Sequence, residues 1–151
     1  GALGFSVGEL RCPNNWGMVA IEGRSGAAID RISIGCRRIN FNTAPPTPMG
    51  STRFSMSVGG NGGSDFGILS CPPGQFAVGL TGLAGGNGAV NQLGIACNTY
   101  DHSASSTSIA SPDAGTWGGT AYSAICPPNK VVRAMRYRFE NYMATVGGNC
   151  K

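Results

Sequence analysis

Six cysteines in three regularly spaced pairs constrain the fold of this chain more than any other feature. The two members of a pair are 24, 26 and 24 residues apart, and the first members follow one another at 59 and 55 residues. The chain therefore contains three units with a period of about 57 residues. The cysteines are Cys12, Cys36, Cys71, Cys97, Cys126 and Cys150.

The repeat also appears in the residues around the cysteines. Each unit opens with Cys-Pro, and a small residue followed by an apolar one stands eight positions after the first cysteine. These small-apolar pairs are Ala20-Ile21, Gly79-Leu80 and Ala134-Met135.

The cysteines are best interpreted as disulfides. Zinc sites usually combine Cys-x-x-Cys pairs or histidines, whereas this chain has no such pair and a single histidine, His102. Six cysteines allow 15 connectivities, and the repeat favours the sequential one, 12–36, 71–97 and 126–150. Disulfides indicate an oxidising compartment, so we expect a secreted protein without a metal or cofactor.

The local patterns favour short strands over helices. Ile32 and Ile34 alternate ahead of Cys36, which is the period of a strand with one buried face. Residues 76–80 and 131–135, which follow the Cys-Pro-Pro turns, are rich in β-branched and apolar residues. Glycine makes up 25 of the 151 residues, so tight turns interrupt almost every helical window.

Three small β units that cannot each bury a face are expected to pack around a common axis. We therefore predict an all-β fold, a β-prism of three Greek-key-like sheets with pseudo-threefold symmetry. A β-trefoil-like barrel is the alternative. Residues 1–151 are predicted to form a single domain of three repeats, at about 1–45, 46–105 and 106–151.

The charge pattern narrows the range of partners. The net charge is +4 and the basic residues are scattered, without the interleaved aromatic residues typical of a nucleic-acid site. No run reaches the roughly 18 apolar residues that a membrane span requires. We expect binding to neither nucleic acid nor a membrane. The first residue, Gly1, is compatible with a processed, exported chain.

The second unit resembles the vitelline membrane outer layer protein I family. The similar residues are Cys71-Pro72-Pro73-Gly74, an apolar run through Leu80, and residues 89–97 (AVNQLGIAC). Trp117-Gly118 ahead of Cys126 is similar to an aromatic-glycine motif of that family. The resemblance implies a β-prism of three Greek-key sheets in an extracellular protective coat, with a link to carbohydrate.

The sequence offers more for binding than for catalysis. Its seven carboxylates are scattered, and Asp101-His102-Ser103 are neighbours in a loop, which does not produce a catalytic triad. No catalytic residue is therefore predicted. Sugar sites combine short polar side chains on turns with an aromatic platform, for which Trp16 is one candidate. The candidate carbohydrate-binding residues are Asp30, Asp65, Asn91, Gln92, Asp113 and Trp117.

These observations favour a non-enzymatic, secreted extracellular protein that binds glycans, builds a protective coat or matrix, or does both. One alternative is a self-assembling filament subunit that binds no sugar. A second is a carbohydrate-active enzyme, either a glycosidase or a transglycosylase. The expected partners are glycans, extracellular matrix proteins and further copies of the chain in a homo-oligomer or filament.

Overall fold

The computed structural model describes residues 6–85, 89–112, 119–139 and 143–151. Within these ranges the regular structure consists entirely of β-strands, and no helix there has the length and apolar character to cross a membrane. The strands are β1 (Ser6–Arg11), β2 (Trp16–Ser25), β3 (Ile29–Asn40), β4 (Thr47–Phe54), β5 (Val58–Gly59), β6 (Ser64–Ser70), β7 (Phe76–Ala84), β8 (Val90–Asn98), β9 (Thr107–Ala110), β10 (Thr120–Ile125), β11 (Val132–Phe139) and β12 (Met143–Cys150).

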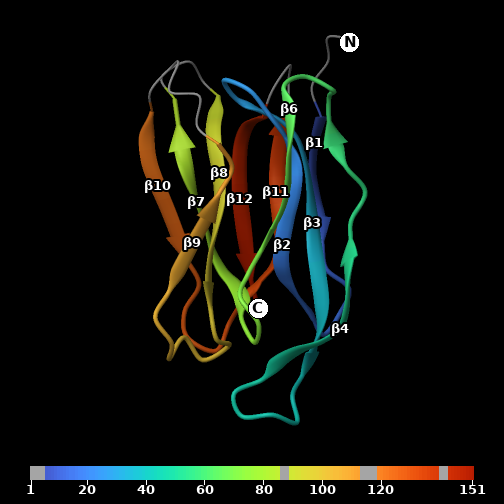
Figure 1. Ribbon diagram of the computed structural model, residues 1–151, viewed down its shortest axis with the longest axis vertical. Coiled ribbons are helices and arrows are strands. Elements are labelled where there is room, and N and C mark those ends of the chain that lie inside the picture. The colour runs from blue at the N-terminus through green and yellow to red at the C-terminus, as the bar shows by residue number, and fades with distance from the viewer. Residues whose placement is uncertain (1–5, 86–88, 113–118, 140–142) are drawn as a thin grey trace.

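The strands form three antiparallel sheets around one interior. Their orders are β1-β11-β12, β10-β7-β8-β9 and β4-β3-β2-β6, with the short β5 pairing on β3. The strands run along the long axis of the molecule, and the three sheets stand around that axis (Figure 1). This arrangement is a β-prism, as predicted, and not the trefoil-like barrel.

The core contains the inward residues of all three sheets. Four side chains, those of Ile32, Ile34, Leu93 and Ile95, are fully buried in one cluster with Met135 of the sheet built on β11. The period-two pattern ahead of Cys36 is thereby confirmed, and Leu93 and Ile95 repeat it ahead of Cys97. Burial of each such side chain contributes about 1.5–3 kcal/mol to the stability of the fold.

The three disulfides have the predicted sequential connectivity. Cys12 pairs with Cys36, Cys71 with Cys97 and Cys126 with Cys150, at Cα–Cα distances of 5.8, 5.6 and 5.8 Å. We call β2, β7 and β11 the central strands. In each unit the first cysteine lies shortly before the central strand, and the second lies on the strand that follows and pairs with it.

The turn after each Cys-Pro is the same in the three units. The third residue after the cysteine, which is Asn15, Gly74 or Asn129, has a φ of +66°, +80° or +65°. The following N–H donates to the carbonyl of the proline, at 3.0, 3.1 and 3.2 Å. Glycine and asparagine are the residues that adopt this left-handed conformation at the lowest cost.

A β-bulge follows each of these turns and joins one unit to the next. The register of the central strand pair shifts by one residue at Val19, Val78 and Arg133, seven residues after the first cysteine. The carbonyl of each bulged residue accepts a hydrogen bond from the first cysteine of the following unit. The three bonds are Cys71 N–H to Val19, Cys126 N–H to Val78 and Cys12 N–H to Arg133, at 2.8, 2.7 and 2.8 Å. Because the third bond returns to the first unit, the three form a closed ring.

The sheets do not coincide with the sequence units. The strand ahead of each first cysteine pairs with the central strand of the preceding unit: β6 with β2, β10 with β7 and β1 with β11. The sheet built on β2 therefore extends from residue 16 to residue 70 and crosses the predicted division at 45/46. This exchange connects every unit to a neighbour on each side.

Candidate functional site

Two of the predicted sugar-binding residues lie at the hairpin end of the sheet built on β2. Asp30 stands at the start of β3, and Asp65 on β6 is paired with Arg24 of β2. The glycine loop at residues 59–63 connects β5, which pairs with β3, to β6, and Gly60 N–H donates to the Asp30 carbonyl at 2.8 Å. The fold therefore gathers residues 24, 30 and 65 although 41 positions separate the first from the last.

Asp30 packs against the glycine loop. A Cβ on Gly63 would lie 2.7 Å from Asp30 Oδ2 and 2.4 Å from the backbone of Ser25, so no larger residue fits there. Arg24 closes the same loop, donating from Nε to Gly62 O at 3.1 Å and from Nη2 to Gly63 O at 2.8 Å. Burial raises the pKa of Asp30, and the charge of Arg24 partly opposes that rise. The carboxylate therefore packs against the loop, and the hydrogen bonds of Arg24 hold the loop in place.

A polar hollow of about 160 Å³ opens beside this loop, which we call the hairpin hollow. Ser33 Oγ donates to Glu22 Oε1 at 3.0 Å, and Arg31 Nη1 donates to Asn61 Oδ1 at 3.1 Å. Asp65 Oδ1 accepts from Gly67 N–H at 2.9 Å. The wall thus offers carboxylate acceptors and guanidinium donors together. Its lining residues are Glu22, Gly23, Arg24, Arg31, Ser57 and Asp65.

Sequence reasoning identified only Asp65 among these charged lining residues. Glu22 and Arg24 alternate on β2, and Arg31 is paired with Arg24 across the hairpin. The spacing of Glu22 and Arg24 indicates that both lie on one face of the strand. Adding Arg31 to that face required the register of the hairpin, which the sequence alone did not give.

The structure separates Asn91 and Gln92 from this hollow. Asn91 and Gln92 lie on β8, in another sheet. Asn91 is buried, and Gln92 Nε2 donates to Ser111 O at 2.9 Å. Asp113 and Trp117 lie outside the described residues. Asn91 therefore occupies in the second unit the position that Asp30 has in the first, six residues ahead of a cysteine.

Trp16 lies at the opposite end of β2 from the hairpin hollow. Eight residues separate it from Arg24, which corresponds to about 26 Å of strand. Its ring is half-buried, and the guanidinium carbons of Arg38 and Arg53 lie 5.9 and 5.6 Å from the ring centroid, within cation–π range. Arg38 on β3 is paired with Trp16 on one side and with Met49 of β4 on the other, so the three residues are neighbours across the strands.

These residues line an open hollow of about 370 Å³, which we call the Trp16 hollow. Its remaining wall is an irregular part of β4, where Gly50 has a φ of +74° and the register against β3 shifts. The shift brings Arg53 toward the ring. The lining residues are Trp16, Arg38, Met49, Gly50, Ser51 and Arg53.

Of the adjacent Asp101, His102 and Ser103, the first and third are hydrogen-bonded to each other, and His102 has a different partner. Asp101 Oδ1 accepts from Ser103 Oγ at 2.8 Å and from Thr99 Oγ1 at 2.7 Å, and these bonds lower the pKa of Asp101. His102 Nε2 lies instead 2.9 Å from the carbonyl of Lys130. The three residues form a structured turn. Across the ranges that the structure describes, no group of three or more His, Cys, Asp or Glu residues could hold a metal ion.

Comparison with known proteins defines the architecture further. No protein-family model and no curated protein sequence matches this chain. Solved structures do match over nearly its whole length. The fold is that of the β-prism lectins. A prostate-specific WGA16 glycoprotein lectin superposes with a TM-score of 0.66 at 16% identity, covering 100% of this chain and 94% of that one.

Two further structures agree. AcmJRL, a mannose-binding jacalin-related lectin from Ananas comosus, superposes with a TM-score of 0.56 at 21% identity, covering 95% of this chain and 96% of that one. Jacalin in its mellibiose complex gives 0.62 at 10% identity, covering 97% and 98%. Because all three identities are low, the likeness establishes the β-prism and not the vitelline membrane outer layer protein I family.

Proposed function

We propose that this protein is a non-enzymatic carbohydrate-binding protein. The observation that carries the proposal is the full-length likeness of its fold to solved structures described as lectins, one a mannose-binding protein and one bound to mellibiose. The hydrogen bonds around residues 101–103 add to it, since Ser103 Oγ donates to Asp101 while His102 Nε2 lies against the carbonyl of Lys130, which is not the arrangement of a catalytic triad.

We assign the glycan site to the hairpin hollow. Each sugar hydroxyl both donates and accepts hydrogen bonds, so a sugar site needs acceptors and donors on one wall. Glu22 and Asp65 supply acceptors, and Arg24 and Arg31 supply donors. Asp30 borders this wall through its packing against the glycine loop. Asn91 and Gln92, together with Asp113 and Trp117, remain proposed contributors from other parts of the chain.

We further propose that the protein is secreted and acts in a protective coat or matrix. Three disulfides favour an oxidising compartment. The sheet that contains β1 has three strands within the described ranges, with β1 and β12 at its edges, and Val7 on β1 is 66% exposed. Edges of this kind support pairing with another copy of the chain or with a matrix protein.

The test is a screen of neutral glycans and polysaccharides, chitin included, with the native protein sized by light scattering in the same buffer. We expect saturable, selective binding that Asp65→Asn weakens about tenfold, because a charge-assisted hydrogen bond to the sugar becomes a weaker neutral one. Asp101→Asn is the matched control. It removes the same charge from an exposed turn that lines neither hollow and keeps an acceptor oxygen in place.

Absence of binding to every neutral glycan would overturn the proposal. Large ordered assemblies in the same sample would then favour the filament alternative. Turnover of a glycan that Glu22→Gln or Asp65→Asn abolishes, with the fold intact, would instead establish a carbohydrate-active enzyme.

A further inference from the structure

Beside two bonds of the hydrogen-bonded ring, the structure has a groove between two units. One surrounds Cys12, has a volume of about 260 Å³, and is called here the Cys12 groove; it is lined by Arg11, Cys12, Asn14, Asn15, Arg133 and Lys151. A second surrounds Cys71, has a volume of about 190 Å³, and is called the Cys71 groove; it is lined by Val19, Arg37, Thr52, Ser70, Cys71, Pro72, Pro73 and Gln75.

The two grooves are equivalent in backbone and different in charge. The residue ahead of the cysteine is Arg11 in one groove and Ser70 in the other. The bulged residue whose carbonyl accepts the cysteine N–H is Arg133 in one and Val19 in the other. Only the residue after the second cysteine is basic in both, as Lys151 and Arg37. The Cys12 groove therefore holds three cationic side chains where its counterpart holds one.

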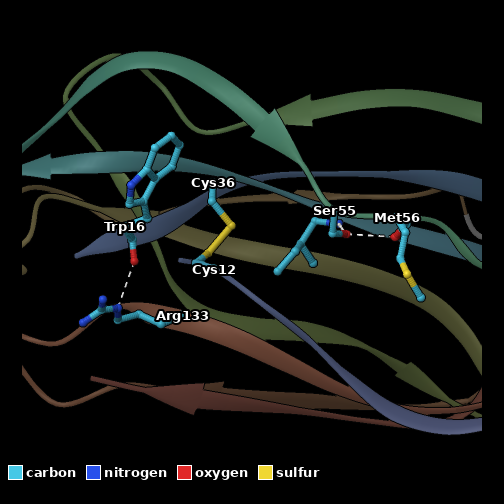
Figure 2. The surroundings of a disulfide bond; sticks show 7 residues. Cys12, Trp16, Cys36, Ser55, Met56 and Arg133 are labelled. Atoms are coloured by element: carbon cyan, nitrogen blue, oxygen red, sulfur yellow. Dashed lines mark hydrogen bonds between the residues drawn. A yellow bond between two sulfur atoms is a disulfide. The ribbon is translucent and has the colours of Figure 1, made fainter. Parts of the chain in front are cut away.

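The Trp16 hollow adjoins the Cys12 groove. Arg133, which lines the groove, donates from Nε at 2.9 Å to the carbonyl of Trp16, which lines the hollow. Figure 2 shows the indole of Trp16 and the side chain of Arg133 on opposite sides of the Trp16 backbone, next to the Cys12–Cys36 disulfide. Arg38 and Arg53 add two more guanidinium groups at the indole.

Few acidic groups offset this charge. Of the residues that the structure describes, Arg11 and Glu9 form the only salt bridge. Arg38 and Arg53 thus lie against an aromatic ring without a carboxylate partner in that part of the chain. Clustered cations in adjacent depressions focus an electrostatic field that attracts anions.

We propose that the Cys12 groove and the Trp16 hollow together bind an acidic polysaccharide, with its sulfate or carboxylate groups on the cations and a sugar ring beside Trp16. Guanidinium groups bond such anions through paired, directed donors. Two discrete depressions divided by a strand suit separate acidic groups along a chain. This site lies about 26 Å along β2 from the hairpin hollow and does not depend on the proposal for that hollow.

The test compares dextran sulfate and carboxymethyl dextran with unsubstituted dextran, so that sulfate, carboxylate and the neutral backbone are separated. We expect the wild-type protein to bind at least one charged dextran, to lose affinity as salt is raised, and to ignore the neutral polymer. The double variant Arg11→Ser/Arg133→Val installs the residues that the Cys71 groove carries. It should weaken binding at least tenfold.

Arg136→Gln/Arg138→Gln is the matched control, since it removes two positive charges from β11 outside both depressions. We expect it to change binding less than threefold, about half a kcal/mol. Arg53→Gln/Lys151→Gln is a second test variant, which leaves the Arg133 hydrogen bond intact in case the first variant unfolds. Circular dichroism and thermal unfolding verify the fold of each.

Equal weakening by the test and control variants would overturn the proposal, because net charge alone would then explain binding. Equally tight binding of single-stranded DNA at the same salt, with the same dependence on Arg11 and Arg133, would overturn the assignment to polysaccharide. If the wild-type protein binds no neutral glycan in the separate screen but binds dextran sulfate through this groove, only the proposal for the hairpin hollow is contradicted.

Discussion

The Cys12 and Cys71 grooves have the same backbone and carry different side chains. In both, a cysteine N–H donates to the carbonyl of a bulged residue at 2.8 Å, and a left-handed turn follows a proline. The scaffold at these positions is therefore set by backbone hydrogen bonds, which leave the side chains free to differ. Arg133 and Val19 show the result, since the same bulge presents a cation in one groove and an apolar contact in the other.

The largest effect should come from the shared scaffold. Cys12→Ala/Cys36→Ala and Cys71→Ala/Cys97→Ala each open a loop of similar length, 24 and 26 residues. We expect each to lower the free energy of unfolding by about 2–5 kcal/mol, and the two losses to agree within about 1 kcal/mol. Urea unfolding measures both. A much larger loss at one groove would show that the scaffolds are not equivalent.

Exchange of the bulged residues should be tolerated in one direction only. Val19 is 5% exposed and packs in a cluster with Phe76 and Ile39, so Val19→Arg should cost about 2–4 kcal/mol through crowding and a poorly solvated charge. Arg133 is half-buried, and Arg133→Val should change stability by about 1 kcal/mol at most, since it loses one hydrogen bond to Trp16. Thermal unfolding of the two variants compares them directly, and similar losses would contradict this asymmetry.

Substitutions in the turns beside the grooves should change stability only through the backbone conformation that the new residue must adopt. A Cβ on Gly74 would meet nothing within 4 Å. Gly74→Val should therefore lower the free energy of unfolding only by the roughly 1–2 kcal/mol that a positive φ costs a β-branched residue. Asn15→Gly, which gives the first turn the residue of the second, should change stability by about 0.5 kcal/mol or less. Chemical denaturation of both is the measurement, and a large loss for Asn15→Gly would reveal a side-chain role at the Cys12 groove.

The smallest effect concerns pH, because the described carboxylates with shifted pKa values lie outside both grooves. Burial raises the pKa of Asp30, so its contribution to stability is fully present below its ordinary value of 3.8 and is lost as pH rises through the folded-state pKa. Hydrogen bonds from Thr99 and Ser103 lower the pKa of Asp101, so its contribution is present above 3.8 and is lost as pH falls.

Unfolding measured across this acid range should therefore show opposite trends in the two variants. Relative to the wild type, Asp30→Asn should gain stability at neutral pH more than at pH 3, and Asp101→Asn should lose it at neutral pH more than at pH 3. The same trend in both would contradict these assignments.

The sequence predicted the parts of the fold that repeat. Three copies of the Cys-Pro turn favoured the sequential disulfide connectivity, and the alternation of Ile32 and Ile34 located a buried strand, because each signal is local and occurs more than once. The exchange of β1, β6 and β10 between sheets was not predicted, since pairing between distant strands leaves no mark in the spacing of residues.

The candidate sites were predicted less completely for the same reason. Asp65 was identified from its residue type and its position in a turn-rich segment, whereas Glu22 and Arg31 of the same wall required the hairpin register. The Cys12 groove combines Arg11, Arg133 and Lys151 from opposite ends of the chain. Only the closure of the third unit onto the first brings these cations together.

The closed ring of cysteine–bulge hydrogen bonds also determines how such a protein can change in evolution. In open repeat arrays, a unit can be added or removed at either end, because each contacts only its neighbours. Here β1 pairs with β11 and Cys12 bonds to Arg133, so the first and last units are neighbours and no unit is terminal. Duplication or deletion of one unit would break the closure. Closure therefore ties this architecture to three units, while the side chains that each groove presents can differ without breaking the ring.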